Sequence, residues 1–410
     1  MPLFYRNPVQ IVRGEGVWLY DEKGNALLDM YNNVPCAGHC HPHVVKAIQK
    51  QVAILNVHSR YLHEGILNYT DRLTALHAEG LSSAVFTCSG SEANEVALNM
   101  ARIATEGRGI ICTDAAYHGN TAEVARLTRR GGEQSREIRS IPFPQCYRPI
   151  KDNLTPSALT DLYLAELESA IEAFTKDGTA LAGMLLCPIL ANEGLPNIPP
   201  GFMPRAAKLI REAGGLVIAD EVQSGFCRTG CWWGYELMDF EPDIAVMGKP
   251  MGNGIPFAGV VAGTELVNIF RDSTKYFNTF ASSPLQAAAG MAVLDVIESE
   301  NIRQNVIDVG KYLANELSQL QESCPFLGEV RGRGLFIGLE WVRDRSSRTA
   351  DPEGAYEIVN CMRNKGILIS NAGALRNIIK IRPPLVLQKE DADLFLTAFE
   401  ESMREFDGAI

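Results

Sequence analysis

Short apolar runs alternate with stretches of helical periodicity between about residues 84 and 263. The runs are continuously apolar rather than alternating, which is typical of strands that are buried on both faces of a sheet. Strands of this kind that alternate with helices predict an α/β domain with a largely parallel sheet. The expected strands are residues 84–87, 109–112, 184–187, 216–219, 244–247 and 259–262.

The two ends of the chain have a different pattern. Residues 17–29 predict a β-hairpin around a Gly-Asn turn, and a helix pattern follows Pro42. Further helices are predicted over 284–299 and from Lys389, with three short strands between them. We expect a large domain over 51–295 and a smaller α+β domain over 296–410, with residues 1–50 packing on the smaller one. The stretch 129–157 has no clean period, and connections of that length are often functional.

The overall balance of charge excludes some classes of function. The 410 residues include 38 Lys and Arg against 49 Asp and Glu, a formal net charge of −11, which argues against a nucleic-acid partner. No apolar run approaches the ~20 residues that a membrane helix needs. Residues 1–10 have no signal-peptide pattern, so we expect a cytoplasmic protein without a membrane partner.

The ten cysteines are scattered without a Cys-x-x-Cys pair, and we expect reduced structural thiols. His39, Cys40, His41 and His43 resemble a metal site, but the flanking Gly and Pro are typical of a turn. No second group of ligands completes a coordination sphere, so no metal is predicted.

Three segments that each follow a predicted strand have the residues for chemistry. Ser89-Gly90-Ser91 stands at a strand-to-helix corner, where backbone N–H groups suit a phosphate; a plain Ser N-cap is the alternative. Asp220-Glu221 ends another strand, and one carboxylate there suits a protonated ring nitrogen. The same pair is also compatible with a metal site or a helix cap.

The third segment contains Lys249 among glycines, just past a buried strand. A desolvated lysine loses its proton readily and forms Schiff bases with aldehydes, although most loop lysines are simply solvated. A phosphate cradle, a ring-nitrogen carboxylate and a Schiff-base lysine together fit one cofactor, pyridoxal 5'-phosphate.

These residues belong to longer motifs that resemble class III (ω-type) aminotransferases of PLP fold type I over nearly the whole chain. Within that class the chain looks closest to the alanine–glyoxylate aminotransferase 2-like branch, which also contains phospho-lyases. The motifs are Gly38-His-Cys-His-Pro42, Ser89-Gly-Ser-Glu-Ala-Asn94, Tyr117-His118-Gly119, Asp220-Glu-Val-Gln223, Gly225-Phe-Cys-Arg-Thr-Gly230, Gly248-Lys-Pro-Met-Gly-Asn-Gly254, Tyr276-Phe-Asn-Thr279 and Arg331-Gly-Arg-Gly-Leu-Phe-Ile-Gly338.

The resemblance implies a role for each matching residue. Lys249 would hold the cofactor as a Schiff base and move the proton, and Asp220 would bind the pyridinium nitrogen. The rest of the cofactor site would be Ser89, Gly90 and Ser91 at the phosphate, Val222 and Tyr117 on the two ring faces with His118 beside them, and Gln223 at the ring hydroxyl. Thr279 would reach the phosphate from a neighbouring subunit, which implies a homodimer with shared active sites or a tetramer of such dimers.

The chain departs from the family where many members have a salt bridge for dicarboxylic substrates. Asn192 stands in the place of the glutamate, and Lys380 in the place of the arginine. Lys380 and Arg382 lie on the same face of a predicted strand and are the expected substrate-binding residues.

We therefore expect an aminotransferase that moves an amino group from an amine or amino acid to a keto acid such as pyruvate. The alternative is a phospho-lyase acting on a phosphorylated amino alcohol. A non-catalytic regulator on the same fold is the third hypothesis, and the presence of Lys249 argues against it.

Overall fold

The computed structural model describes residues 4–128 and 135–407, and a seven-stranded sheet forms its centre. The strand order is β4-β10-β9-β8-β7-β5-β6. The six predicted runs are all strands of this sheet, so the predicted α/β fold is confirmed. The bounds are β4 (Ser83–Thr87), β5 (Gly109–Thr113), β6 (Ile138–Ile141), β7 (Leu181–Leu186), β8 (Leu216–Asp220), β9 (Ile244–Met247) and β10 (Ala258–Ala262).

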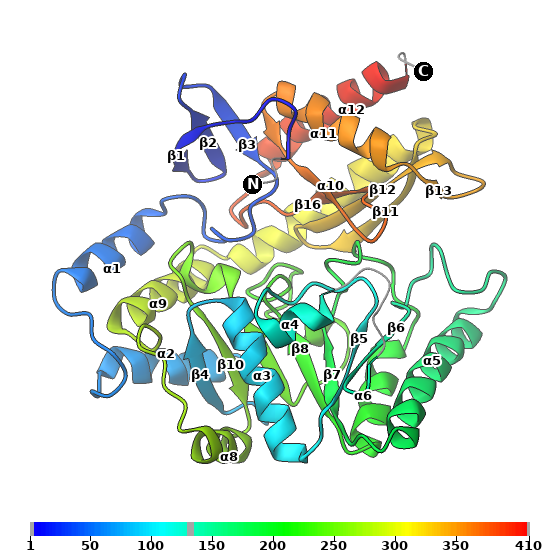
Figure 1. The fold of residues 1–410 in the computed structure, drawn as a ribbon. Coiled ribbons are helices and arrows are strands. Elements are labelled where there is room, and N and C mark those ends of the chain that lie inside the picture. The colour runs from blue at the N-terminus through cyan, green and yellow to red at the C-terminus, as the bar shows by residue number, and fades with distance from the viewer. Residues whose placement is uncertain (1–3, 129–134, 408–410) are drawn as a thin grey trace.

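The sheet is buried on both faces, which explains the continuous apolar runs. Neighbouring residues of one strand belong to two different core clusters: Val85 and Phe86 do so in β4, and Ile110 and Ile111 in β5. Helices cover both faces, as Figure 1 shows. They are α2 (Glu64–Thr74), α3 (Gly90–Thr105), α4 (Ala122–Leu127), α5 (Pro156–Lys176), α6 (Phe202–Glu212), α7 (Gly234–Leu237), α8 (Thr264–Thr274) and α9 (Pro284–Ser299).

The strand directions decide where a ligand site lies. β5, β6, β7, β8 and β9 are mutually parallel, while β10 is antiparallel to both of its neighbours, β9 and β4. Two antiparallel steps make β4 parallel to β9. The carboxyl ends of β4, β7, β8 and β9 therefore meet at one edge, where sheets of this kind bind ligands.

The remaining elements lie above that edge in Figure 1. One sheet has the order β1-β2-β3-β14 and the other the order β11-β12-β16-β15, with β13 pairing β12. The strands are β1 (Ile11–Glu15), β2 (Trp18–Asp21), β3 (Ala26–Asp29), β11 (Leu327–Arg333), β12 (Phe336–Asp344), β13 (Thr349–Ala350), β14 (Ile367–Leu368), β15 (Ser370–Ala372) and β16 (Ile378–Ile381), and the helices are α1 (Pro42–Val52), α10 (Ile302–Ser323), α11 (Pro352–Asn364) and α12 (Lys389–Asp407).

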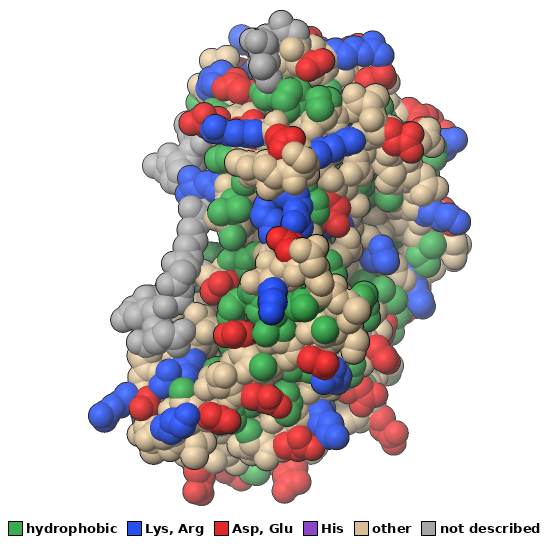
Figure 2. Space-filling view, turned by 90° about the vertical axis from the view of Figure 1, so that its right-hand side faces the viewer, with side chains coloured by type: hydrophobic (Ala, Val, Ile, Leu, Met, Phe, Trp, Pro, Cys, Tyr) green, Lys and Arg blue, Asp and Glu red, His purple; other side chains and the backbone are tan. Residues whose placement is uncertain are grey.

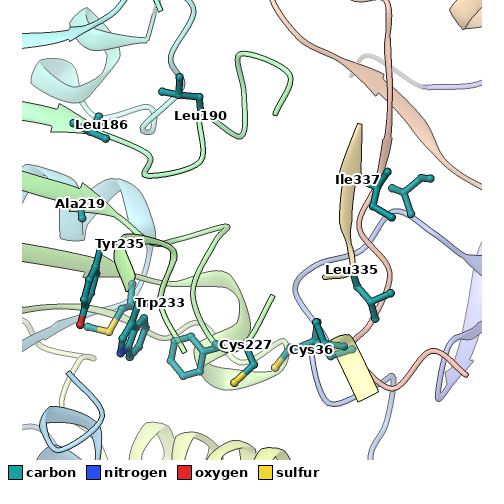
Figure 3. Close-up of a cluster of buried hydrophobic side chains, with 14 of the residues drawn as sticks. Cys36, Leu186, Leu190, Ala219, Cys227, Trp233, Tyr235, Leu335 and Ile337 are labelled. Carbon is teal, nitrogen blue, oxygen red and sulfur yellow. The ribbon is translucent and has the colours of Figure 1, made fainter. Parts of the chain in front are cut away.

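The N-terminal strands join the C-terminal part because β3 pairs in parallel with β14. This pairing supports the division at residues 50 and 295, which we keep as a proposal that limited proteolysis can test. The core is continuous across the upper and lower layers. Figure 3 shows Cys36, Cys227 and Leu335 close together, although they come from three distant parts of the chain.

Several features of the fold differ from the sequence prediction, and β11, β13, α10 and α11 were not predicted at all. Strand β6 lies in the stretch 129–157, where no strand was predicted, and β1 extends the hairpin. Only the first and last residues of β6 are buried, and Arg139 and Ser140 separate them, so this edge strand lacks an apolar run. Residues 129–134 of the same stretch lie outside the described residues.

The described part of the chain has no helix that is long and apolar enough to cross a membrane. Figure 2 shows a face on which acidic and basic side chains are mixed. None of the ten cysteines forms a disulfide. His39, His41 and His43 each pair with a carboxylate of Asp29, Glu300 and Asp295, respectively, and the described residues contain no group of three potential ligands that could hold a metal.

Candidate active site

A cavity of about 120 Å³ lies at the carboxyl ends of β4, β8 and β9. The three predicted segments meet here, together with the loop after β5 and the loop after β7. The lining residues are Gly90, Ser91, Tyr117, His118, Gly119, Cys187, Asn192, Asp220, Val222, Gln223 and Lys249.

The segment after β4 contains the helix cap that was one of the two functions left open by its sequence. The Ser89 hydroxyl accepts from the Glu92 backbone N–H at 3.3 Å, and the Glu92 carboxylate accepts from the Ser89 backbone N–H at 3.0 Å. Ser89 is thus the N-cap of α3 in a capping box. Gly90 and Ser91 line the cavity instead, at the first turn of a 16-residue helix whose N-terminus favours an anion.

Two glycines allow close packing of the walls at this end of the cavity. A Cβ atom on Gly90 would lie 3.1 Å from both methyl groups of Val222. One on Gly119 would lie 2.5 Å from the Ser91 hydroxyl, and Gly119 also has a φ of +144° that favours glycine. The Ser91 hydroxyl accepts from the Asn120 backbone N–H at 3.1 Å, which fixes its place beside Gly119. The two glycines therefore allow Val222 and Ser91 to pack closely against the backbone that forms this end of the cavity.

Gly119→Ala is expected to weaken pyridoxal-phosphate binding about tenfold, because the new Cβ must push the 117–120 loop or Ser91 away from the wall. Titration of the apoenzyme with the cofactor measures this. Gly80→Ala is the control, since a Cβ there meets nothing within 4 Å. Unchanged affinity in Gly119→Ala would contradict a phosphate site at this end.

Asp220 is held in place by three donors. Its Oδ2 lies 2.7 Å from His118 Nδ1 and accepts from Asn94 Nδ2 at 3.1 Å, while its Oδ1 accepts from the Val222 backbone N–H at 3.0 Å. Asn94 also donates to the His118 carbonyl at 2.8 Å, which ties the two partners together. A buried carboxylate with this many donors is a fixed negative charge at the cavity wall.

Lys249 begins the 3-10 helix η1 (Lys249–Gly252) directly after β9. Burial lowers the pKa of Lys249, the Asp220 charge raises it, and the Arg382 charge lowers it again. The side chain lines the same cavity as Asp220. An amine with a lowered pKa opposite a fixed carboxylate is suited to covalent binding of an aldehyde and to proton transfer.

Val222 and Tyr117 supply two surfaces of the cavity. Val222 is buried and its methyl groups lie between Gly90 and Gly248, where added Cβ atoms would be 3.1 and 3.3 Å away. The Tyr117 ring is 41% exposed, and its hydroxyl donates to Asn120 Oδ1 at 3.2 Å. Val222 and Tyr117 therefore give the cavity one aliphatic and one aromatic surface. The family resemblance implied that these two residues contact the two faces of the cofactor ring.

Gln223 lines the cavity, but Lys380 and Arg382 do not. Lys380 is fully buried, and its Nζ donates to the Ala191 carbonyl at 2.6 Å and to Gln223 Oε1 at 3.3 Å. Arg382 also donates to Gln223 Oε1, at 3.2 Å. Substrate binding by these two residues stays a prediction, and their observed contacts are with Gln223.

Thr279 lies apart from the cavity of its own chain. It lines a separate hollow with Glu92, Glu95 and Phe280. Phe280 is 77% exposed, and Leu62, in the loop before α2, is 94% exposed. Arg60 lies over the Phe277 ring at 4.3 Å, so the loop before α2 and the segment around Thr279 contact each other.

Two polar residues near the site were not assigned a role from the sequence. Asn94 binds both Asp220 and His118, and its position in the Ser89–Asn94 motif was the available signal. Glu193 is buried and hydrogen-bonds to the Thr113 hydroxyl, and burial raises the pKa of its carboxyl group. Nothing in the linear sequence distinguishes the buried Glu193 from a solvated loop glutamate.

The arrangement fits pyridoxal phosphate. The cavity has space beside a helix N-terminus for the phosphate, a fixed carboxylate for the ring nitrogen and an amine for the aldehyde. Lys249, Asp220, Gly90 and Ser91 would hold the cofactor, with Val222 and Tyr117 beside the ring.

Comparison with known proteins supports the same interpretation. The class-III aminotransferase family model matches residues 4–403. An alanine–glyoxylate aminotransferase 2-like protein of Drosophila melanogaster is 37% identical over 98% of this chain and 84% of its own. The mitochondrial alanine–glyoxylate aminotransferase 2 of Homo sapiens is 31% identical over 98% and 83%. Because that relative is named as mitochondrial, the expected cytoplasmic location stays a prediction.

Among solved structures, a phospholyase from Arthrobacter in complex with phosphoethanolamine is 39% identical, with a TM-score of 0.94 over 98% of this chain and 96% of that chain. A thermostable ω-transaminase variant is 23% identical with a TM-score of 0.91 over 98% and 94%, a likeness that concerns the fold alone.

Proposed function

The chain belongs to the class III aminotransferases, which are pyridoxal-phosphate enzymes, and we propose that it moves an amino group from an amine or amino acid to a keto acid such as pyruvate. The observation that carries the proposal is Lys249, whose pKa is lowered by burial, in the same cavity as the fixed carboxylate of Asp220.

The residues of the site have separate tasks in this proposal. Bound pyridoxal phosphate supplies an electron sink for the bond that breaks at the substrate carbon. Lys249 Nζ takes up and returns the proton that moves between substrate and cofactor carbon atoms. Asp220 keeps the ring nitrogen protonated, and His118 and Asn94 keep Asp220 in place.

A monocarboxylic acceptor is favoured by the contacts of Asn192 and Lys380. Asn192 accepts from Gln223 Nε2 at 2.9 Å and donates to the Tyr117 carbonyl at 3.0 Å, so both ends of its amide are occupied. Lys380 is fully buried and donates to Ala191 and Gln223. Neither residue has free donor groups that could bind the second carboxylate of a substrate such as 2-oxoglutarate through two hydrogen bonds.

A phospho-lyase that acts on a phosphorylated amino alcohol is the second candidate. It is favoured by the 39% identity and TM-score of 0.94 to a phospholyase that was solved with phosphoethanolamine. A lyase has a single amine substrate and needs no switch between two substrates, which agrees with the absence of the glutamate and arginine pair at Asn192 and Lys380.

Half-reactions without an acceptor distinguish the two activities. The holoenzyme is mixed with single amines, amino acids and phospho-amino alcohols, while cofactor absorption and inorganic phosphate are recorded. The transaminase proposal expects stoichiometric conversion of the cofactor to its amine form, and pyruvate should restore the starting spectrum. Multiple turnovers that release phosphate and ammonia, with the cofactor unchanged, would replace that proposal with the lyase.

We further propose a homodimer in which Thr279 reaches the partner's cavity. This proposal is supported by the position of Thr279 outside its own cavity, beside the exposed apolar side chains of Phe277 and Phe280. Such a patch on a folded chain marks an interaction surface. Sedimentation of the holoenzyme as a monomer at micromolar concentration would contradict the dimer.

A further inference from the structure

Two basic residues stand behind the cavity wall and share one acceptor. Lys380, in β16, donates to Gln223 Oε1 at 3.3 Å, and Arg382, just after β16, donates to the same oxygen at 3.2 Å. The arginine side chain has only donors. The oxygen of the Gln223 amide must therefore face β16, and its nitrogen must face away from that strand.

The orientation of Gln223 then fixes the next amide. Gln223 Nε2 donates to Asn192 Oδ1 at 2.9 Å, and Asn192 Nδ2 donates to the Tyr117 carbonyl at 3.0 Å. Every hydrogen bond of this chain runs in one direction, from β16 through two amides to the loop that contains Tyr117. An amide nitrogen has two hydrogens, so Gln223 keeps a second N–H at the wall of the cavity that it lines.

Lys380 has the contacts of a structural donor. Its Nζ is completely buried, donates to the Ala191 carbonyl at 2.6 Å and lies 4.9 Å from the centre of the Phe336 ring. Among the described residues, no carboxylate forms an ion pair with it. Burial lowers the pKa of this amine well below its usual range. A neutral amine has two N–H groups for these bonds and also a lone pair, so the direction of the Gln223 amide is fixed by Arg382, whose guanidinium has only donors.

We propose that Lys380 and Arg382 are positioning residues for the cofactor: they lock the amide of Gln223 with its nitrogen toward the cavity, so that this wall offers a donor to the ionised ring oxygen of pyridoxal phosphate. With the opposite amide orientation, a carbonyl oxygen would face that anion and repel it. The inference concerns cofactor binding alone and holds for either reaction.

Lys380→Met tests the proposal, since methionine fills similar space but donates nothing. A donor at the ring oxygen stabilises its negative charge and weakens its hold on a nearby proton. When the orientation of the Gln223 amide is no longer fixed, the pH midpoint of the bound cofactor's visible absorption is therefore expected to rise by about one unit. Cofactor affinity is expected to weaken about tenfold. Both are measured without substrate. The titratable groups around Lys380 that could contribute are Arg382, Cys187, Glu193 and Lys249.

Matched variants distinguish an effect on the orientation of Gln223 from a general loss of protein stability. Lys389→Met alters an exposed lysine that lies over the Tyr312 ring, and it should leave both values unchanged. Lys380→Arg keeps a donor and should restore the midpoint. Arg382→Met removes the other donor to the same oxygen and should shift the midpoint in the same direction, which keeps the proposal testable if Lys380→Met does not fold.

A double-variant cycle decides whether the effect passes through Gln223. If it does, adding Lys380→Met to Gln223→Ala should change the midpoint no further. A wild-type midpoint and affinity in both Lys380→Met and Arg382→Met, or full additivity with Gln223→Ala, would overturn the proposal.

Discussion

Lys249→Ala is expected to lose covalent attachment of pyridoxal phosphate and at least about 10³-fold in turnover, because the same Nζ would hold the aldehyde and move the proton. Lys249 is the lysine that lines the cavity, and burial lowers its pKa. Borohydride reduction followed by peptide mass spectrometry should find the cofactor mass on the Lys249 peptide of the wild type. The variant should have no visible absorption band from an attached cofactor.

Lys208→Ala serves as the control, since that side chain is 74% exposed and forms only a loose pair with Glu212 at 3.7 Å. It should keep wild-type turnover and labelling. If Lys249→Ala retained turnover near that of the wild type, or if another lysine were labelled, the assignment of Lys249 would be wrong.

The central sheet could be predicted because burial of both faces of a strand requires several consecutive apolar residues. When both faces of a strand pack against helices, each residue must be apolar, and β8 and β9 have no polar residue before the carboxyl end. The site was predictable for a related reason. In parallel strands the residues that follow the carboxyl ends converge, so Ser91, Asp220 and Lys249 share one cavity although 158 residues separate the first from the last.

The direction of side chains could not be predicted in the same way. Lys380 lies in β16 as predicted, whereas Arg382 lies just after the end of that strand. Spacing alone does not tell whether a side chain points into a cavity or behind its wall. The answer depends on Gln223, which is 157 residues from Lys380, and on Asn192, which is 31 residues from Gln223. Such a chain of hydrogen bonds between distant loops has no periodic signal.

Ser89 shows a further limit of sequence reasoning. One hydroxyl at a strand-to-helix corner can accept from the helix backbone or bind a phosphate, and the residue type is the same in both cases. The presence of Glu92 three residues later completes a capping box and accounts for the Ser89 side chain. Gly90 and Ser91, one and two residues further along, line the cavity, and phosphate binding by them stays a prediction.

Asp220→Asn is expected to lower turnover about 10³-fold. The variant removes the negative charge that would keep the ring nitrogen of the cofactor protonated. The amide also conflicts with its surroundings. Asn94 Nδ2 donates to Oδ2 and the Val222 backbone N–H donates to Oδ1, so an amide nitrogen would face a donor in either orientation. Turnover and the absorption spectrum of the bound cofactor are the measurements.

Asp243→Asn is a matched control at the opposite edge of the sheet, directly before β9, where Asp243 contacts the amino end of β8. Asp243 accepts from the Val217 backbone N–H at 2.8 Å and pairs with Arg211, so it also anchors β8, but it lies far from the carboxyl edge. Its substitution should lower stability slightly and leave turnover within about twofold of the wild type. If both variants lost turnover equally, Asp220 would act through the stability of β8. A loss confined to Asp220→Asn, with cofactor still attached at Lys249, would place the effect on the ring nitrogen, since attachment requires only the lysine and the phosphate site.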